Sequence, residues 1–222
     1  MGCASRNSPA VFVDFDGTIT DLDTFDVLVH HFAGEAAWRA TERGLHEGRV
    51  PLRDVLQLQA SYVGADFDEV AALLDRSVRV DETFPAFVAA CRAHRMPVTV
   101  VSSGIERLIR LRLEALGLGD LRIVANDVVA DPAGWCIRFR DPVPNGTDKA
   151  ALVRLAREAG ASTIFIGDGL SDYAAALEAD RRFARRGRKL EHYLREREVA
   201  FEPFSSFADI TASLAAEPAM QP

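Results

Sequence analysis

Four short apolar runs recur along the chain, and helical patterns lie between them. The apolar runs occupy residues 10–15, 97–101, 121–125 and 162–166. The helical patterns occupy residues 84–95, 105–116 and 147–159. Runs this short and this apolar are typical of strands that are buried on both faces of a sheet. Their alternation with helices predicts an α/β fold, in which a parallel sheet is the middle layer of a Rossmann-like three-layer core.

One long segment interrupts this alternation, because residues 21–80 carry helical patterns and no strand pattern. Apolar residues from Leu22 to Phe32 fall at helical spacing, and later segments repeat the pattern between glycines. We therefore predict a helical bundle that is inserted just after the first strand. The expected domains are an α/β core, made of residues 1–20 and 81–222, and a helical domain, made of residues 21–80.

Two smaller segments also have a recognisable pattern. Residues 126–130 and 135–140 flank the turn sequence Asp131-Pro132-Ala133-Gly134, which predicts a β-hairpin after the third strand. Residues 181–189 form a basic run, and glutamates interleave with the arginines that follow it. We interpret this run as the solvated face of a helix and not as a nucleic-acid site.

The overall charge is acidic, with a formal net charge of -7 and a pI of about 5.3. An acidic chain repels nucleic acid and anionic membrane surfaces, so neither is an expected partner. Three cysteines give no disulfide framework, and residues 1–9 lack the apolar core of a signal peptide. No apolar run approaches the roughly 18 residues that a membrane span needs. We therefore expect a cytoplasmic protein, either a monomer or a homodimer.

Polar clusters follow three of the four apolar runs, and a lysine opens the helix before the fourth run. The clusters are Asp14-Phe15-Asp16-Gly17-Thr18, Ser102-Ser103-Gly104 and Gly167-Asp168-Gly169-Leu170-Ser171-Asp172, and the lysine is Lys149. Function in a parallel α/β sheet lies beyond the carboxyl ends of the strands. We therefore expect these clusters to converge on one pocket.

The residue types in these clusters are suited to phosphoryl transfer. Asp14 and Asp16 are two residues apart and face the same way in an extended segment, and Asp168 adds a further carboxylate. Few carboxylates with water and a substrate phosphate are the usual ligands of Mg²⁺. One carboxylate can attack phosphorus while another moves a proton. Lys149 and the hydroxyl of Ser102 can offset the charge on the phosphoryl group.

Together the clusters resemble the four motifs of the haloacid dehalogenase superfamily of phosphohydrolases. The matching stretches are DFDGTIT at 14–20, VVSSG at 100–104, Lys149, and GDGLSD at 167–172. The resemblance implies that Asp14 is the nucleophile and Asp16 the acid/base, while Ser102 and Lys149 bind phosphate. It also implies that Asp14, Asp168 and the main-chain oxygen of Asp16 hold Mg²⁺.

The same resemblance assigns supporting roles to neighbouring residues. Those expected to contact the substrate are Gly17, Ser103, Gly104 and Asp23, and those expected to stand behind the site are Thr18 and Asp172. Two of these segments also have a simpler interpretation. Asp23 is equally suited to be the N-cap of the first inserted helix, and Ser102-Ser103-Gly104 can cap the helix that follows it.

The helical insertion is similar to the four-helix cap, a C1-type cap, of the subgroup that contains phosphoserine phosphatase. In that enzyme a glutamate holds the substrate ammonium and a cap arginine holds its carboxylate, whereas Asp23 and Gln59 stand here, with Arg53 nearby. DFDGTIT followed by Asp23 is more similar to the methionine-salvage phosphatases. The sequence therefore predicts a phosphatase for a small phosphorylated metabolite. Phosphoserine phosphatase, a phosphotransferase or mutase, and a non-catalytic phospholigand-binding protein are the alternatives.

Overall fold

The computed structural model describes residues 9–216, so almost all of the N-terminal segment 1–9 lies outside the described part. The chain forms two compact units. The first unit contains Met1–Asp14, Asp81–Val100 and Lys149–Pro222, and the second contains Phe15–Val80 and Val101–Asp148. The division into residues 1–20 with 81–222 and residues 21–80 follows the expected roles of the segments and stays a prediction.

The first unit is built around parallel strands. Strand β1 (Ala10–Val13) pairs with β2 (Val98–Ile105) on one side and with β5 (Thr163–Gly167) on the other. Strands β6 (Arg181–Arg185) and β7 (Glu202–Phe204) continue the parallel pairing beyond β5. The predicted parallel sheet is therefore confirmed, and its central strands are almost fully buried, as their apolar sequences require.

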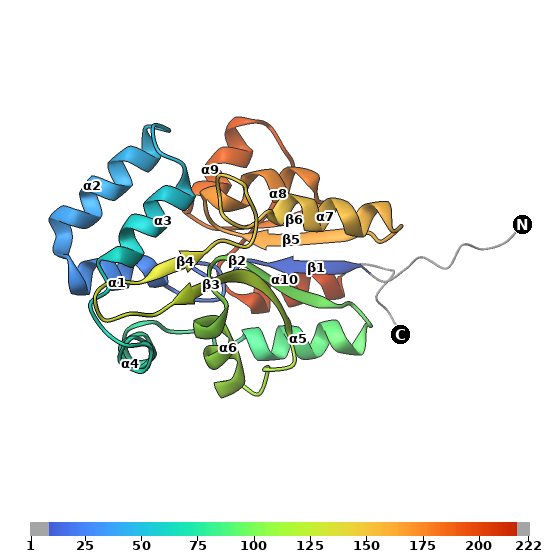
Figure 1. The fold of residues 1–222 in the computed structure, drawn as a ribbon. Coiled ribbons are helices and arrows are strands. Elements are labelled where there is room, and N and C mark those ends of the chain that lie inside the picture. Colours follow the sequence, from blue (N-terminus) through green and yellow to red (C-terminus); the bar gives the residue numbers. More distant parts are fainter. Residues whose placement is uncertain (1–8, 217–222) are drawn as a thin grey trace, which may run out of the picture. The chain divides into compact units, whose positions relative to one another are not determined.

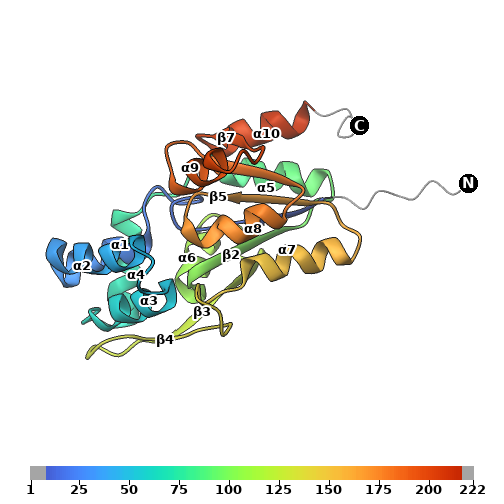
Figure 2. The ribbon, with the colours of Figure 1, turned by 90° about the horizontal axis from the view of Figure 1, so that it is seen from above.

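Helices cover both faces of these strands. Helices α5 (Phe84–Ala93) and α10 (Phe207–Ala215) lie on one side of β5, and α7 (Lys149–Glu158) and α8 (Tyr173–Glu178) lie on the other (Figure 2). Helix α9 (Lys189–Glu196) contacts α8 and β6. This arrangement gives the three layers that the alternation of strands and helices predicts.

The basic run at 181–189 is not the face of a helix, so the helical part of our interpretation was wrong. Its first half forms strand β6, in which Phe183 and Ala184 are buried. Arg181 donates to both carboxylate oxygens of Glu202 on β7. Our interpretation considered only the charged residues of the run. The apolar residues between those charges are buried, and their burial favours a strand within the sheet.

The second unit contains all four helices of the insertion. These are α1 (Thr24–Phe32), α2 (Gly34–His46), α3 (Leu52–Ser61) and α4 (Phe67–Ser77) (Figure 1). Helix α6 (Glu106–Ala115) and strands β3 (Arg122–Val129) and β4 (Cys136–Arg138) complete this unit. β3 and β4 pair antiparallel, which confirms the predicted hairpin.

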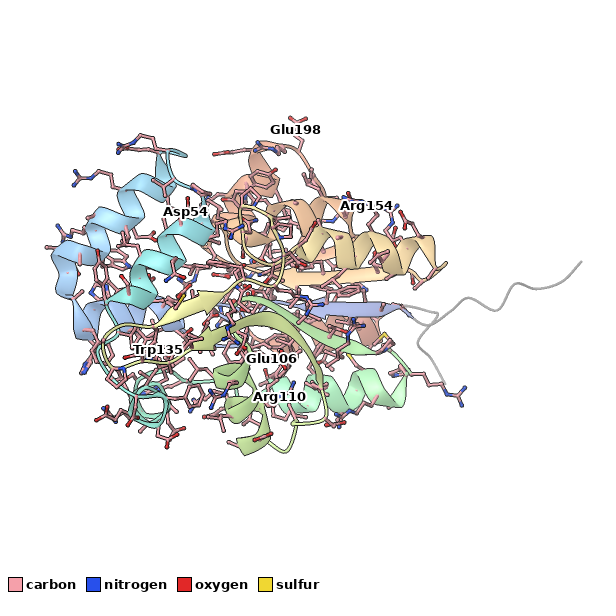
Figure 3. The ribbon with its side chains drawn as sticks, viewed as in Figure 1. Asp54, Glu106, Arg110, Trp135, Arg154 and Glu198 are labelled. Carbon is pink, nitrogen blue, oxygen red and sulfur yellow. The ribbon has the colours of Figure 1, made fainter. Side chains whose placement is uncertain are left out.

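The core of the second unit joins the helical insertion to the hairpin. Trp135, marked in Figure 3, is 1% exposed, stacks on Phe67 and donates from Nε1 to the Ala65 oxygen at 2.8 Å. Phe25 and Leu28 of α1 belong to the same buried cluster. The insertion therefore packs on residues from beyond 101 as well as on itself.

Among residues 9–216, seven strands form the sheet, in the order β4-β3-β2-β1-β5-β6-β7. β1 lies at the centre of the order, and Asp14 follows it directly. Within residues 9–216, no helix combines the length and the apolar character that crossing a membrane requires.

Candidate active site

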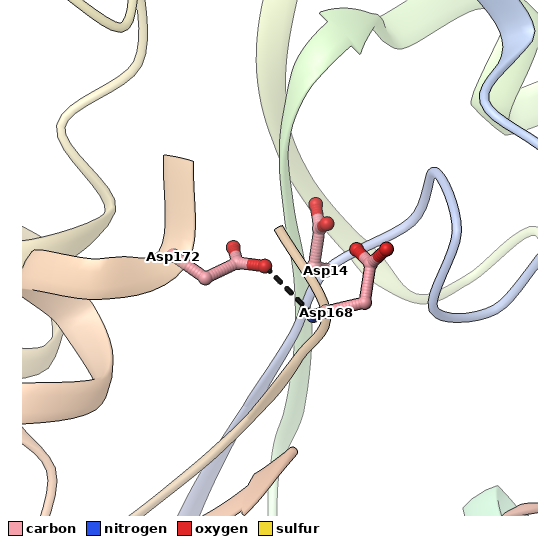
Figure 4. Close-up of side chains that lie close together, drawn as sticks. All are labelled: Asp14, Asp168 and Asp172. Atoms are coloured by element: carbon pink, nitrogen blue, oxygen red, sulfur yellow. Dashed lines mark hydrogen bonds between the residues drawn. The ribbon is translucent and has the colours of Figure 1, made fainter. Parts of the chain in front are cut away.

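Three aspartates come together in the first unit. One carboxylate oxygen from each of Asp14, Asp168 and Asp172 lies within 4.8 Å of the others (Figure 4). Asp14 follows β1, and its N–H donates to the Ile166 oxygen of β5 at 2.9 Å. Asp168 follows β5. The carboxyl ends of two neighbouring parallel strands therefore bring Asp14 and Asp168 together, as the sequence predicts.

Lys149 is the cation of this cluster. It opens α7 and is 2% exposed. Its ammonium donates to Asp14 Oδ1 at 2.6 Å, to Asp172 Oδ1 at 2.7 Å and to Ser171 Oγ at 3.0 Å. An ammonium has three N–H donors, so these three contacts fix its position.

Asp172 organises the loop between β5 and α8. Its Oδ2 accepts hydrogen bonds from the N–H groups of Asp168 and Gly169, each at 2.9 Å, and its Oδ1 accepts from Lys149. A Cβ at Gly167 would lie 2.5 Å from Asp172 Oδ2, so only glycine fits there. Because both oxygens of Asp172 accept from protein donors, Asp14 and Asp168 are the better candidates for metal ligands.

Burial and neighbouring charges shift the pKa values of Asp14 and Lys149. Burial raises the pKa of Asp14 well above its usual value, and the nearby charge of Asp172 raises it further, against the lowering effect of Lys149. Burial by itself would lower the pKa of Lys149, but the Asp14 and Asp172 carboxylates raise it above its ordinary value. Desolvation and a neighbouring like charge explain the direction for Asp14, whereas attraction to two carboxylates explains the direction for Lys149.

A divalent cation fits this set of residues. Asp14, Asp168 and Asp172 carry three negative charges when ionised, and Lys149 offsets one of them. Two negative charges then remain, which equals the charge that Mg²⁺ would neutralise. Carboxylate oxygens are also the ligand type that hard cations such as Mg²⁺ prefer.

A second cluster lies in the second unit around the Asp16 carboxylate. Asp16 Oδ1 accepts from the N–H of Thr24 at 3.0 Å, and Oδ2 accepts from Ser102 Oγ at 3.3 Å. Ser102 Oγ in turn accepts from the N–H of Gly104 at 2.8 Å. The predicted acid/base and the predicted phosphate-binding hydroxyl are therefore in contact.

The Ser102-Ser103-Gly104 stretch belongs to strand β2, which continues to Ile105, and not to a loop after the strand. The N-cap interpretation of this stretch is wrong, because the residue before α6 is Ile105 and no side chain caps that helix. A Cβ at Gly104 would lie 2.7 Å from Asp16 Oδ2, so glycine is needed beside the carboxylate. The buried Ser103 Oγ has no hydrogen-bond partner among the described residues, which suits it to a ligand or water contact.

The turn after Asp16 has the features that the sequence predicts for a close backbone approach. Gly17 has a φ of 73°, and its N–H donates to Thr20 Oγ1 at 3.1 Å. Thr18 is fully buried, and its N–H donates to the Phe15 oxygen. Asp23 caps α1 by accepting from the N–H groups of Phe25 and Asp26. The N-cap interpretation of Asp23 is thus confirmed, and its contact with substrate stays a prediction.

Asn126 is a residue that sequence reasoning missed. It is fully buried, and its Nδ2 donates to the Ser103 oxygen at 2.7 Å. Its Oδ1 accepts from the Arg140 N–H at 3.0 Å and from Thr147 Oγ1 at 3.3 Å. One amide thus joins β2 to the segment that leads to Lys149. Asn126 lies inside the predicted hairpin, where an asparagine gives no sequence signal of a functional role.

The sheet carries carboxylates directly after the parallel strands β1 and β5, an arrangement that suits a hydrolase. The sequence profile of the haloacid dehalogenase-like hydrolases matches residues 11–177. The chain belongs to this family, and it is a phosphatase of the haloacid dehalogenase type.

Two curated relatives resemble nearly the whole chain. Polyol phosphate phosphatase of Saccharomyces cerevisiae is 31% identical over 92% of this chain and 91% of its own. The 2-hydroxy-3-keto-5-methylthiopentenyl-1-phosphate phosphatase of Geobacillus kaustophilus is 30% identical over 92% of this chain and 94% of its own. The resemblance to methionine-salvage phosphatases that the motifs indicate is confirmed as a likeness between sequences.

A solved structure confirms the fold. A substrate-bound phosphoserine phosphatase matches with a TM-score of 0.74 and covers 94% of this chain and 99% of its own. The sequences are 18% identical, so this likeness concerns the architecture alone.

Proposed function

We propose that this phosphatase hydrolyses the phosphomonoester of a small metabolite through a phosphorylated Asp14, with Mg²⁺ as its metal. The observation that carries the proposal is the buried contact between Lys149 Nζ and Asp14 Oδ1 at 2.6 Å, made in the cluster that contains Asp168. A buried cation holds the nucleophile in place and offsets the charge that it shares with the phosphoryl group.

The reaction takes two steps. First, an Asp14 oxygen forms a bond to phosphorus while the bond from phosphorus to the leaving oxygen breaks, and Asp16 gives its proton to that oxygen. Asp16 then takes a proton from water, and the water oxygen attacks the phosphorus of the aspartyl phosphate. The bond between phosphorus and Asp14 breaks, and inorganic phosphate leaves. Ser102 is the proposed hydroxyl donor to the phosphoryl oxygens.

Asp14 and Asp168 are the proposed carboxylate ligands of Mg²⁺, with the main-chain oxygen of Asp16 as a third ligand. When bound, Mg²⁺ neutralises charge on the phosphoryl group. Lys149 and Asp172 then keep the two carboxylate segments in place.

The proposed substrate lacks the amino acid group of phosphoserine. Gln59, which stands at the expected place of the cap arginine, is 3% exposed and donates to Thr41 Oγ1 at 3.2 Å. Asp23 uses its carboxylate to cap α1. The relatives from Saccharomyces cerevisiae and Geobacillus kaustophilus are named for a polyol phosphate and a methylthiopentenyl phosphate. These observations favour a small phosphorylated polyol or keto compound, such as a methionine-salvage intermediate.

The test measures Mg²⁺-dependent phosphate release from p-nitrophenyl phosphate and from a panel of phosphorylated polyols, keto compounds and amino acids. We expect release by the purified protein, loss of release on removal of Mg²⁺ with a chelator, and no turnover by Asp14→Asn. A folded, Mg²⁺-loaded protein that releases phosphate from none of these esters would refute the proposal.

The same assay separates the alternatives. Retention of an intact ester would identify a non-catalytic binder. Product that forms only with an added hydroxyl acceptor would identify a phosphotransferase or mutase. A preference for phosphoserine over every polyol phosphate would overturn the proposed substrate class but would not contradict the proposed reaction.

A further inference from the structure

Helix α9 contacts the loop that carries Asp168. The main-chain N–H of Leu190, in the first turn of α9, donates to the main-chain oxygen of Asp168 at 2.8 Å. The hydroxyl of Tyr173, which follows the loop directly, donates to the Lys189 oxygen at 3.4 Å. The loop is therefore attached to α9 at both of its ends.

Aromatic stacking strengthens this attachment. The rings of Tyr173 on α8 and Tyr193 on α9 are nearly parallel, at 16°, with centroids 3.7 Å apart. The Arg197 guanidinium carbon lies 3.9 Å from the centroid of the Tyr193 ring. Leu190 and Leu194 are fully buried and anchor α9 to the first unit. Stacked rings with a cation over them add stabilisation beyond their buried area.

The loop needs such support because it must hold a charged ligand close to like charges. Asp172 supports the loop from the inside, by accepting from the Asp168 and Gly169 N–H groups. α9 supplies the contact to the Asp168 carbonyl. Partners that orient a metal ligand typically change metal affinity by about 10- to 100-fold when they are removed.

We propose that α9 positions Asp168 for the divalent cation, and that Tyr193, through its stack on Tyr173, is the positioning residue that holds α9 against the loop. The proposal rests on the proposed use of Mg²⁺ by this site. Tyr193 is not one of the residues that we propose to hold the metal or the substrate. It acts through Tyr173 and through the hydrogen bond between Leu190 and Asp168.

The test compares Tyr193→Leu, which removes the ring, with Tyr193→Phe, which keeps it. Mg²⁺ affinity of the purified proteins is measured by titration calorimetry, and the metal dependence of turnover is measured separately. We expect Tyr193→Leu to bind Mg²⁺ about 10-fold more weakly, with turnover restored at saturating Mg²⁺, and Tyr193→Phe to stay within about twofold of the original chain. A folded Tyr193→Leu with unchanged Mg²⁺ affinity would overturn the proposal.

A second measurement needs no variant, in case Tyr193→Leu does not fold. Coupling between two sites is reciprocal, so Mg²⁺ binding must stabilise α9 if α9 supports Mg²⁺ binding. We expect Mg²⁺ to slow hydrogen exchange in a peptide that covers residues 186–197. Unchanged exchange in a protein that binds Mg²⁺ would refute the role of α9. An original chain that binds no Mg²⁺ would refute the proposed function instead.

Discussion

The main-chain N–H of Thr24 donates a hydrogen bond to Asp16 Oδ1 at 3.0 Å. Thr24 is the first residue of α1, so its N–H belongs to the group that has no acceptor within the helix. The bond joins the first helix of the insertion to the carboxylate that we propose as acid/base. A helix N-terminus favours a nearby negative charge, which adds to the effect of the hydrogen bond.

Thr24→Pro is the substitution that removes this donor most selectively. Proline is tolerated at the first position of a helix, and Asp23 before it already has the extended conformation that a following proline requires, with φ at -74° and ψ at 128°. Loss of a hydrogen bond to a charged group costs about 1.5–3 kcal/mol, so we expect turnover to fall by roughly 10- to 100-fold. Thr24→Ser keeps the N–H and is the control. Equal turnover of the two variants, measured at saturating ester, would show that the donor is dispensable.

Gly104→Ala should reduce turnover because its methyl group would lie 2.7 Å from Asp16 Oδ2 and 3.1 Å from Ser102 Oγ. A carboxylate that is displaced by even a fraction of an ångström loses its alignment, and we expect a loss of about 10- to 100-fold. Gly119→Ala is a matched control, since its methyl group meets Glu114 Cγ at the same 2.7 Å on an exposed side chain. Comparable losses in both variants would point to general destabilisation. Thermal unfolding of both proteins checks this directly.

Asp14→Asn should change how stability depends on pH. The folded state raises the pKa of Asp14 above the ordinary 3.8, mainly through burial. The folded state therefore binds its proton more tightly than the unfolded state does, and stability falls as pH rises from about 3.8 through the raised pKa. We expect the metal-free asparagine variant to lack this pH-dependent loss of stability and to be the more stable protein at neutral pH. Urea denaturation with a chelator over a pH series measures it, and identical slopes for the two proteins would contradict the prediction.

Asn126→Asp should weaken the binding of phosphate esters. The new carboxylate keeps the shape of the side chain but places an acceptor against the Ser103 oxygen, where Nδ2 now donates at 2.7 Å. An unmatched buried polar group costs about 1–3 kcal/mol, so we expect lower stability together with a raised KM. Thr147→Val removes only the bond from Thr147 Oγ1 to Asn126 Oδ1 and should have a smaller effect. A KM that does not change in Asn126→Asp would separate Asn126 from the substrate site.

Local patterns were sufficient for most of the fold. The apolar runs at 10–15 and 162–166 became β1 and β5, because runs this rich in apolar residues are typical of strands that are buried on both faces. The helical spacing in 21–80 gave four helices, and Lys149 opens α7 as predicted. The short strand β6 was wrongly predicted as helix, since the arginines on either side hide the apolar character of the buried Phe183 and Ala184.

Contacts between distant segments could not be predicted in this way. Gln59 aligns with the substrate-binding arginine of the cap, yet its side chain is buried and donates a hydrogen bond to Thr41. Asn126 shows no motif of its own, and its three partners come from Ser103, Arg140 and Thr147. Such contacts depend on which side chains the packing of separate elements brings within hydrogen-bond distance.

By itself, the sequence determined the family, the order of the strands and helices along the chain, and the identity of the charged residues, because each of these depends on neighbours in the chain. The tertiary structure alone decided that Lys149 lies between Asp14 and Asp172, and that α9 contacts the Asp168 loop. The physical reason is desolvation. A buried charge is stable only where the packed chain supplies partners at the right distance, and those partners lie far away in the sequence.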